Sequence, residues 1–592
     1  MNRGFPNCLK AVRLAVGLLA LAIAMAWAAP AVAQVVRYRV EVEAPEELKK
    51  ILQKGLTLVH WERDPQMSAE QLRRLTDDAV REAREAAATE GWFSAHVEAR
   101  IDDSIEPKVV RLRVEPGERT RVGEVEIRFR GPAADDAAAK DAFKRVRQAW
   151  NLRRGEPFRQ ADWEAAKRAV VREMAAWRYA AASVADSRAT IDPQSARASL
   201  MVDIESGPPF RFGELRVSGV RRYPESAVTN LSPIRPGDDY DRDKVLLYQR
   251  RLLETGYFAS VQADIDPQPR VADASPVRVS VIEATSQHFE TGLSYNTDVG
   301  LRAEIGYSNQ DIFDSAWRFR SALKLDQKIQ DLRLDFDSPP RPGAVWNNFF
   351  TSARQQDIQN ERTREFAVGT AYNFGFERTP SAWLLSWHLE EQRVLDQQPD
   401  TRYAVYFGHR RTFRHTDDIV SPRNGYYGSL EVGGTPGEPL ASRAFLRVVA
   451  SGTYFFSLGR RDDVLLRAEA GGVASNSREG IPSTFLFRTG GDQTVRGYAF
   501  QSLGVQQGEA IVGGRRLAVG SAEYIRWVGE NWGLAGFVDA GDAWDSGVRF
   551  TPALGYGVGA RVRTPIGPIR ADVAHGVRVG GYRVHFSVGF NF

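Results

Sequence analysis

The chain has 592 residues, of which 43% are hydrophobic and 26% are charged. At about 100–200 residues per domain, this length predicts several folded domains, and the composition excludes a generally disordered chain. Mean hydropathy is −0.37, and no uninterrupted apolar run of about 18 residues follows residue 33, which excludes a bundle of membrane-spanning helices.

The first 33 residues are predicted to be a secretory signal peptide. Arg3, Lys10 and Arg13 form a positive segment, an apolar core runs from Leu14 to Ala29, and Ala31-Val32-Ala33 is a small-residue cleavage site. Removing this segment takes away three cations and no acid, so the formal net charge falls from +4 to +1. The pI of 9.0 therefore gives no support to nucleic-acid binding.

The single cysteine, Cys8, lies inside the predicted signal peptide. We therefore expect a mature chain without disulfides, cysteine metal sites or lipid-modified cysteine, stabilised by packing and backbone pairing alone. The eight histidines show no zinc-binding spacing, and no G-x-S-x-G motif or placeable carboxylate pair is present. Neither an enzyme nor a cofactor is expected.

From about residue 35 to 285 the chain repeats itself three times. Arg121-Val122-Gly123-Glu124-Val125 recurs as Arg211-Phe212-Gly213-Glu214-Leu215. Helix ends are marked by Gly91-Trp92-Phe93, Arg178-Tyr179-Ala180 and Gly256-Tyr257-Phe258. A glycine and an aromatic residue after a helix are typical of an ordinary helix end, so these residues indicate packing rather than a ligand site. Each unit is predicted to run strand, helix, helix, strand, strand.

Local signals support helices within these units. Ser68 and Gln71 have the spacing of a capping box ahead of a helical apolar pattern. In the third unit we predict an apolar helix stripe made of Val245, Leu246, Leu252 and Leu253.

From about residue 286 onward the pattern changes to strands separated by turns. The last segment alternates strictly, with Tyr582, Val584 and Phe586 on one face and Arg583 and His585 on the other. Upstream segments alternate in the same way. The predicted strands, sixteen in all, begin near His288, Leu301, Trp317, Leu332, Asn348, Glu365, Trp383, Tyr403, Tyr427, Phe445, Val464, Leu517, Leu534, Leu554, Ile569 and Tyr582.

The strands of a soluble β-sandwich also alternate between apolar and polar residues. The residue types on the two faces therefore have to distinguish a sandwich from a barrel. Arg, Glu, His and Asp recur on one face and aromatic residues crowd strand ends on the other, which is typical of an outer-membrane barrel. In lipid such a sheet must close on itself, because its backbone groups find no water to bond. The longest connection, about 474–516, falls between the eleventh and twelfth strands. We expect it to lie outside the barrel or to fold back into the lumen.

That connection contains Val495-Arg496-Gly497-Tyr498, and two acids follow it at positions that alternation directs into the lumen. These are Glu523 and Asp539, the second within Phe537-Val538-Asp539-Ala540-Gly541. A guanidinium has five donors in a fixed fork and can bind two carboxylates at once. The alternatives are a solvated arginine in a turn and unrelated polar residues of the lumen.

The three repeats resemble polypeptide-transport-associated (POTRA) domains, although the middle unit has Arg178 where the others have glycine. The whole mature chain resembles the superfamily that includes BamA, TamA, the two-partner-secretion transporters and chloroplast import pores. This resemblance implies that Arg496 docks on Glu523 and Asp539, within the family pattern F-x-D-x-G that Phe537 and Gly541 complete. It also implies that Val495, Gly497 and Tyr498 shape the tip of an inward-folded loop. The implied terminal-strand signal and seam residues are Phe586, Val588, Gly589, Phe590 and Phe592.

The expected fold is therefore three α+β POTRA repeats followed by an all-β, 16-stranded antiparallel transmembrane barrel. The expected domains are a signal peptide at 1–33, POTRA units at 34–119, 120–209 and 210–285, and a barrel at 286–592. The resemblance implies no catalytic residue and no metal.

Three POTRA units and a barrel in this length most resemble the TamA type. That resemblance implies a protein of the Gram-negative outer membrane with periplasmic POTRA domains and a TamB-like inner-membrane-anchored partner. It implies insertion of outer-membrane proteins, autotransporters included, through an opening barrel seam, with no role for nucleic acid. The alternative is a two-partner-secretion pore that exports one dedicated exoprotein.

Overall fold

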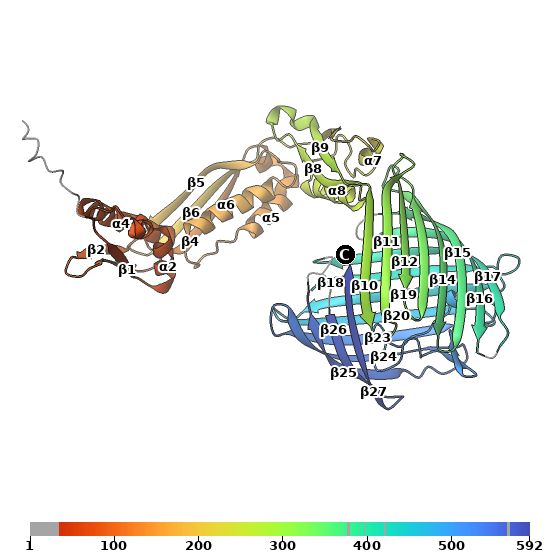
Figure 1. Cartoon of the computed structure of the whole chain (residues 1–592). Helices are drawn as coiled ribbons and strands as arrows, with labels where there is room; N and C mark the ends of the chain where they lie inside the picture. The colour runs from red at the N-terminus through yellow and green to blue at the C-terminus, as the bar shows by residue number, and fades with distance from the viewer. Residues whose placement is uncertain (1–34, 376–378, 396, 419–421, 565–568, 592) are drawn as a thin grey trace, which may run out of the picture. The chain divides into compact units, whose positions relative to one another are not determined.

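The computed structural model describes residues 35–375, 379–395, 397–418, 422–564 and 569–591 (Figure 1). The predicted signal peptide and Phe592 fall outside these residues. The chain forms two compact units, one made mostly of residues before 212 and the other mostly of residues after it. No helix among the described residues is long and apolar enough to span a membrane.

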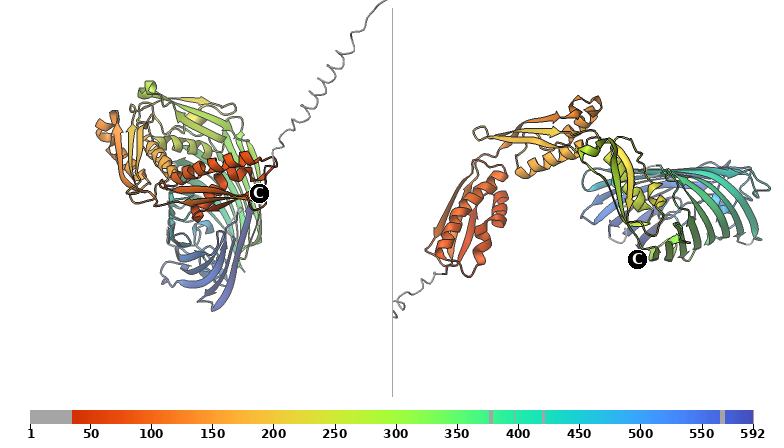
Figure 2. Two further views of the ribbon diagram at one scale, coloured as in Figure 1. Left: turned by 90° about the vertical axis from the view of Figure 1, so that its left-hand side faces the viewer. Right: turned by 90° about the horizontal axis from the view of Figure 1, so that it is seen from above.

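Three small mixed sheets with helices occupy the N-terminal part of the chain (Figures 1 and 2). The first contains β1 (Tyr38–Glu43), α2 (Glu46–Gly55), α3 (Thr57–His60), η1 (Trp61–Arg63), α4 (Ala69–Thr89), β2 (His96–Asp102) and β3 (Lys108–Glu115). The second contains β4 (Arg121–Arg130), η2 (Pro132–Asp135), η3 (Ala137–Ala139), α5 (Lys140–Ala149), α6 (Gln160–Met174), β5 (Ser183–Asp192) and β6 (Arg197–Glu205). The third contains β7 (Phe212–Ser218), α7 (Ser226–Thr229), α8 (Arg242–Glu254), β8 (Phe258–Ile265), η4 (Pro269–Ala274) and β9 (Ser275–Glu283).

All three sheets have the same topology. The last strand of each unit lies in the middle, parallel to the first strand and antiparallel to the second. The apolar residues of the sheet pack against the helices, as in the second unit, where Val202 and Ile204 of β6 meet Trp163 and Val170 of α6 in one buried cluster. The predicted strand-helix-helix-strand-strand order is confirmed.

The helix signals are confirmed in one unit and partly wrong in another. Ser68 accepts a hydrogen bond from the backbone N–H of Gln71, whose side chain accepts one from the backbone N–H of Ser68, so α4 begins with a capping box. In α8, Val245 and Leu252 are buried as predicted. Leu246 and Leu253 are exposed, because each lies one position further round the helix, away from the sheet.

Arg178 takes the same left-handed backbone conformation as the glycines at the matching helix ends. Its φ is 57°, compared with 95° at Gly91 and 76° at Gly256. A side chain in this region is strained, and here the guanidinium is held by Asp136 at 2.6 Å, which also accepts a hydrogen bond from the Tyr179 hydroxyl. The repeat therefore keeps its turn without its glycine.

The remainder of the chain is a closed barrel of sixteen antiparallel strands, as predicted (Figure 1). The observed strands begin within four residues of the predicted starts. They are β10 (Gln287–Asn296), β11 (Gly300–Ile312), β12 (Trp317–Leu325), β13 (Ile329–Asp337), β14 (Trp346–Ile358), β15 (Glu361–Phe374), β16 (Ser381–Val394), β17 (Asp400–Thr416), β18 (Gly425–Thr435), β19 (Phe445–Ser457), β20 (Asp462–Ala474), β23 (Arg516–Trp527), β24 (Trp532–Trp544), β25 (Ala553–Val562), β26 (Ile569–Gly576) and β27 (Gly581–Asn591).

The barrel turns its apolar residues outward and its charged residues inward. Leu534 and Val538 of β24 are exposed on the outer surface, whereas Asp539 between two outward positions is fully buried. The same alternation holds on β19, where Leu446 and Val448 are exposed and Arg447 faces Glu431 across the lumen side at 3.0 Å. Charged side chains therefore gather in the barrel interior.

The long connection between β20 and β23, which we call loop 6, folds back into this interior. It contains η5 (Ser483–Phe485) and a short hairpin of β21 (Val505–Gln507) and β22 (Ala510–Val512). Phe485 and Phe487 of loop 6 belong to a buried cluster with Tyr406, Phe445 and other inward-facing side chains of the barrel wall. Of the two predicted positions, the lumen is therefore the one observed.

Candidate functional site

The tip of loop 6 places Arg496 against two acids of the barrel wall. Arg496 Nε and Nη2 donate to the two carboxylate oxygens of Asp539 at 2.7 and 2.9 Å, and Nη1 donates to Glu523 Oε2 at 2.6 Å. The backbone N–H of Arg496 donates to Asp539 as well, at 3.1 Å. The guanidinium carbon lies 3.4 Å from the centre of the Phe537 ring. The structure thus brings together the arginine and both acids that the sequence singles out.

Two further charged residues, which the sequence reasoning missed, complete the cluster. Arg561 of β25 donates through Nε to Glu523 at 2.9 Å and through Nη1 to Asp572 of β26 at 2.6 Å. Asp572 Oδ2 in turn lies 3.4 Å from Arg496 Nη1. All five side chains are at least nine-tenths buried. Strand alternation was the available signal, because it directs both Arg561 and Asp572 into the lumen.

A third arginine adjoins the cluster through hydrogen bonds to uncharged oxygens. Arg467 of β20 donates to the backbone oxygen of Gln493 at 2.9 Å and to Ser521 Oγ at 3.4 Å, and Ser521 donates to Asp539 at 2.7 Å. Two cations, Arg496 and Arg561, thus pair directly with the three carboxylates, and Arg467 reaches Asp539 only through Ser521. Buried charges cost free energy unless they are paired and hydrogen-bonded, and the direct pairs of Arg496 and Arg561 supply this. We call Arg496, Arg467, Arg561, Glu523, Asp539 and Asp572 the tip cluster.

Glycines let the loop tip lie directly on the strands. Gly497 has a φ of +91°, and a Cβ there would stand 2.7 Å from the backbone nitrogen of Gly576. A Cβ at Gly555 would stand 1.9 Å from the backbone oxygen of Arg496. Larger residues at either position would therefore lift Arg496 away from its acids.

The residues beside Arg496 fix the tip in the same place. Val495 is fully buried in a small cluster with Tyr498, Leu503 and Ala553. The Tyr498 hydroxyl donates to the backbone oxygen of Leu554 at 3.0 Å and accepts from the backbone N–H of Arg578 at 2.9 Å. The tip therefore contacts β25 and the turn between β26 and β27.

Loop 6 has a second attachment on another part of the wall. Glu390 of β16 accepts a hydrogen bond from the backbone N–H of Ser483 at 2.8 Å, and Arg488 pairs with Glu361 of β15 at 2.7 Å. Arg402 of β17 donates to the backbone oxygen of Ile481 at 3.2 Å. Glu361 and Glu390 are both almost completely buried. The loop is thus held at its base by β15–β17 and at its tip by β23–β26.

A serine, a histidine and a glutamate form a hydrogen-bonded chain beneath this second attachment. Ser386 Oγ lies 2.8 Å from His388 Nε2, and His388 Nδ1 lies 2.8 Å from Glu365 Oε1. This is the order of a hydrolytic triad, but such a site also needs donors for an oxyanion. The backbone of β16 at these residues is paired with β15 and β17 on both sides, and the His388 ring packs edge-on against Phe485. The chain of three therefore forms part of the seat of loop 6.

The predicted seam lies between β10 and β27. The two strands pair over five residue positions, from Gly292 opposite Asn591 to Asn296 opposite Ser587, whereas β10 and β11 pair over ten. Phe586, Val588, Gly589 and Phe590 of the predicted terminal signal lie on β27, and Phe592 is outside the described residues. The seam is thus one of the shortest pairings in the barrel.

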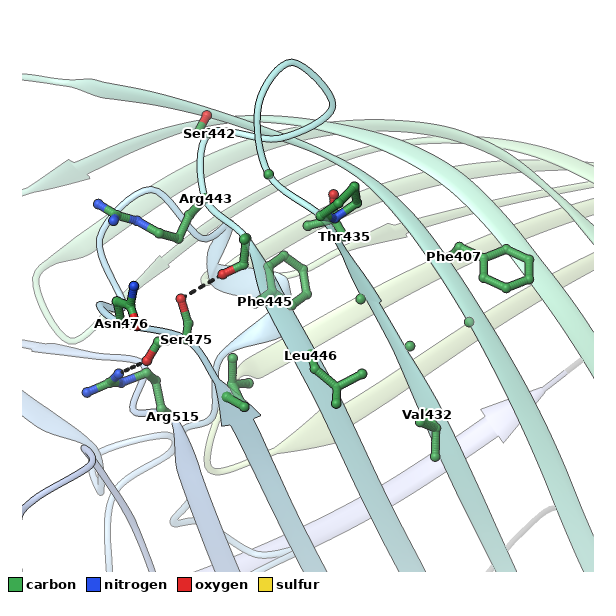
Figure 3. A pocket seen from close by; sticks show the side chains of 18 of the residues that line it. Phe407, Val432, Thr435, Ser442, Arg443, Phe445, Leu446, Ser475, Asn476 and Arg515 are labelled. Carbon is green, nitrogen blue, oxygen red and sulfur yellow. Dashed lines mark hydrogen bonds between the residues drawn. The ribbon is translucent and has the colours of Figure 1, made fainter.

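The outer surface carries a hollow near the rim at which β18 ends (Figure 3). Its lining includes Phe407, Val432 and Leu446, which come from three neighbouring strands, and Gly434.

Comparisons with known proteins agree with this architecture. The Omp85 superfamily domain matches residues 285–592, and a POTRA family, the surface antigen variable number repeat, matches residues 210–283. The outer membrane protein assembly factor BamA of Nitratidesulfovibrio vulgaris is 23% identical over 379 residues, which are 60% of this chain and 47% of that protein. The chain thus spans about half the length of this curated relative.

A solved structure of a BamA barrel has the same fold. The crystal structure of BamA from Haemophilus ducreyi lacking POTRA domains 1–3 has a TM-score of 0.60 at 13% identity, and the match covers 80% of this chain and all of that one. CdiB from Acinetobacter baumannii has a TM-score of 0.46 at 14% identity, covering 80% of this chain and 91% of that one.

The matched superfamily domain covers more than half of the chain and coincides with the observed barrel. The family comprises outer-membrane assembly and secretion barrels rather than enzymes. The chain therefore belongs to the Omp85 superfamily, with its barrel in the outer membrane of a Gram-negative bacterium and its POTRA region in the periplasm.

Proposed function

We propose that this chain is an outer-membrane assembly factor of the TamA type, which inserts outer-membrane proteins such as autotransporters through its barrel seam. The observation that carries the proposal is the short pairing between β10 and β27. The described pairing of β10 with β27 is half as long as its pairing with β11, so little backbone bonding holds this seam. A strand edge that becomes exposed when such a seam opens is a template for another strand.

In this mechanism the incoming client strand adds to the edge of β10 that seam opening exposes. Its backbone then makes the hydrogen bonds that lipid cannot supply, and the seam closes again once the client has left. Gly589 weakens β27 near its end, because glycine contributes no side chain to the sheet. The tip cluster keeps the rest of the C-terminal wall in place while the seam changes.

The three N-terminal units have a separate task in the same proposal. We assign them to POTRA domains at 34–119, 120–209 and 210–285, which receive unfolded clients in the periplasm and contact a TamB-like inner-membrane-anchored partner. The number of units supports the TamA type, since each of the three sheets with its helices forms one repeat.

The test is a disulfide across the seam. Tyr295 and Val588 lie directly opposite each other, and the described residues contain no cysteine, so the pair Tyr295→Cys and Val588→Cys introduces the only thiols of the mature chain. The matched control is Tyr454→Cys with Leu466→Cys, which lie opposite each other on the outer face of β19 and β20. In proteoliposomes supplied with unfolded barrel clients, we expect oxidation to stop insertion in the seam variant only, and a reductant to restore it.

Undiminished insertion by the oxidised seam variant would contradict the proposal. The same vesicles test the alternative, a two-partner-secretion pore. Steady conductance and export of one dedicated exoprotein, without insertion of assorted barrels, would favour the pore.

A further inference from the structure

The tip of loop 6 touches both edges of the seam. On the β10 side, the Asn296 side-chain amide donates to Asp492 Oδ2 at 2.7 Å, and the backbone N–H of Asp492 donates to Asp298 Oδ2 at 2.7 Å. Asp298 lies in the short connection between β10 and β11 and is 3% exposed. The tip is thus bound to the end of the first barrel strand.

On the other edge, the tip is bound to the last strand. The backbone N–H of Gly497 donates to His585 Nε2 at 3.0 Å, and His585 is 2% exposed on the lumen side of β27. Residues 491–498 of loop 6 therefore join two strands that themselves pair over only five positions.

His585 and Asp298 also face each other directly. His585 Nδ1 lies 3.6 Å from Asp298 Oδ1, just beyond hydrogen-bond distance, and both atoms are buried without a hydrogen-bond partner in the described structure. Because Gly497 donates to Nε2, that nitrogen is the acceptor and the ring proton is on Nδ1, where it points at the carboxylate. The arrangement is a polar bridge from β27 to the end of β10, with the loop tip above it.

The neighbourhood of this bridge is tightly packed. A Cβ at Gly491, whose φ is +112°, would stand 2.4 Å from Asp298 Oδ2. The Lys328 ammonium donates to the backbone oxygen of Asp298 and lies 5.5 Å from the Phe500 ring of loop 6. The connection after β10 is therefore fixed to the loop by backbone, side-chain and ring contacts.

We propose that Asp298, His585 and residues 491–498 of loop 6 form a clasp that holds the seam shut at the outer rim, and that the seam opens only when this clasp is released. The proposal assigns His585 and Asp298 as positioning residues, because they act on the seam strands and touch no client. The regulatory role of this clasp rests on the proposed function, but closure of the seam can be measured without any client.

The experiment is hydrogen exchange measured by mass spectrometry on the full mature chain in lipid nanodiscs. Exchange of backbone amides in a native protein reports the population of open states. His585→Ala removes the bridge, and His575→Ala is its matched control, since His575 stands on the adjacent β26 but packs on the outer surface between Tyr556 and Tyr582. We expect amides of 587–591 to exchange roughly tenfold faster in His585→Ala, as for the loss of one buried hydrogen bond, the one from the Gly497 N–H.

In the same samples, peptides from β15 and β16 should exchange at the wild-type rate, and His575→Ala should resemble wild type throughout. Equal exchange at 587–591 in His585→Ala and wild type would overturn the clasp, and so would a uniform increase over the whole barrel. If His585→Ala does not fold, Asp298→Asn tests the same bridge from the connecting loop and carries the same expectations.

The clasp and the proposed function can be contradicted independently of each other. Faster exchange at the seam in a chain that inserts no clients would keep the clasp and reject the assembly role. Unchanged exchange in a chain whose insertion is blocked by the seam disulfide would reject the clasp and keep the assembly role.

Discussion

The N-terminal units bury apolar side chains and expose charged ones, whereas the barrel buries charged side chains and exposes apolar ones. In the second unit, Val202 and Ile204 are buried and the ion pair of Arg128 with Glu126 is exposed. In the barrel, Arg496 is buried and Leu534 is exposed on the outer surface. Buried apolar side chains therefore stabilise the N-terminal units, whereas buried ion pairs stabilise the barrel interior.

The largest effect is expected at the tip cluster. Arg496→Ala leaves Asp539 and Glu523 buried without their main cation, and removing one partner of a buried pair typically costs about 3–5 kcal/mol. We expect a lower yield of folded barrel, measured as the heat-modifiable band on gels and as the midpoint of urea unfolding in vesicles. The control is Arg516→Ala, which removes an exposed arginine at the start of β23. Equal behaviour of the two variants would contradict the assigned role of the cluster.

The next largest effect is expected in the apolar core of the first unit. Leu52→Ala opens a cavity in the core of the first unit, where Leu52 is 1% exposed, and such changes cost about 2–5 kcal/mol. Leu534→Ala removes a side chain of the same type that faces lipid. We expect limited proteolysis to cut the first unit faster in Leu52→Ala, while Leu534→Ala leaves heat-modifiability unchanged. A Leu534→Ala barrel that fails to fold would show that its outer face is a packed interface.

A smaller, pH-dependent effect is expected at Asp136. The hydrogen bond from Tyr179, together with the Ala138 N–H and the Arg178 guanidinium, lowers the pKa of Asp136 below its ordinary value. A lowered folded-state pKa stabilises the unit above the unfolded pKa of about 3.9, and the contribution is lost as the pH falls through the folded value. Asp136→Asn should therefore lower the thermal midpoint of the POTRA region at pH 7, by a difference that shrinks below about pH 4. A difference independent of pH would contradict this assignment.

The smallest effect is expected at the surface of the second unit. Arg128 and Glu126 pair at 2.7 Å with both side chains about half exposed, and solvent screens such pairs. Arg128→Ala should leave the thermal midpoint of the POTRA region unchanged within error. A clear decrease would mean that this face of β4 is covered by another surface.

Much of the fold follows from the sequence for one physical reason. A strand between lipid and a wet lumen has to alternate, so Tyr582, Val584 and their polar neighbours on the last strand indicate both the structure and its environment. The helix of the third unit was predicted less well, because a run of leucines does not show which of them face the sheet. Leu246 and Leu253 accordingly turn outward.

The site was predictable only in part. Strand alternation directed Glu523 and Asp539 into the lumen, and resemblance to a family pattern implied that Arg496 docks on them. Their docking role stays a prediction although the structure brings the three residues together. Arg561 and Asp572 lie on strands where alternation directs many polar residues inward, so nothing singled them out. The pairing of Asp298 with His585 depends on closure of the barrel, which brings residues 287 positions apart into one place.

The seat of Arg496 also constrains the order in which the chain can assemble. Its three carboxylate partners lie on three different strands, β23, β24 and β26. Gly555 of β25 lies directly against the backbone of Arg496. A nascent barrel that stops after β23 therefore carries an arginine with one acid, and each later hairpin brings more of its compensation. Full charge compensation of Arg496 therefore requires the C-terminal hairpins, and the loop tip reaches its final position only when these hairpins are in place.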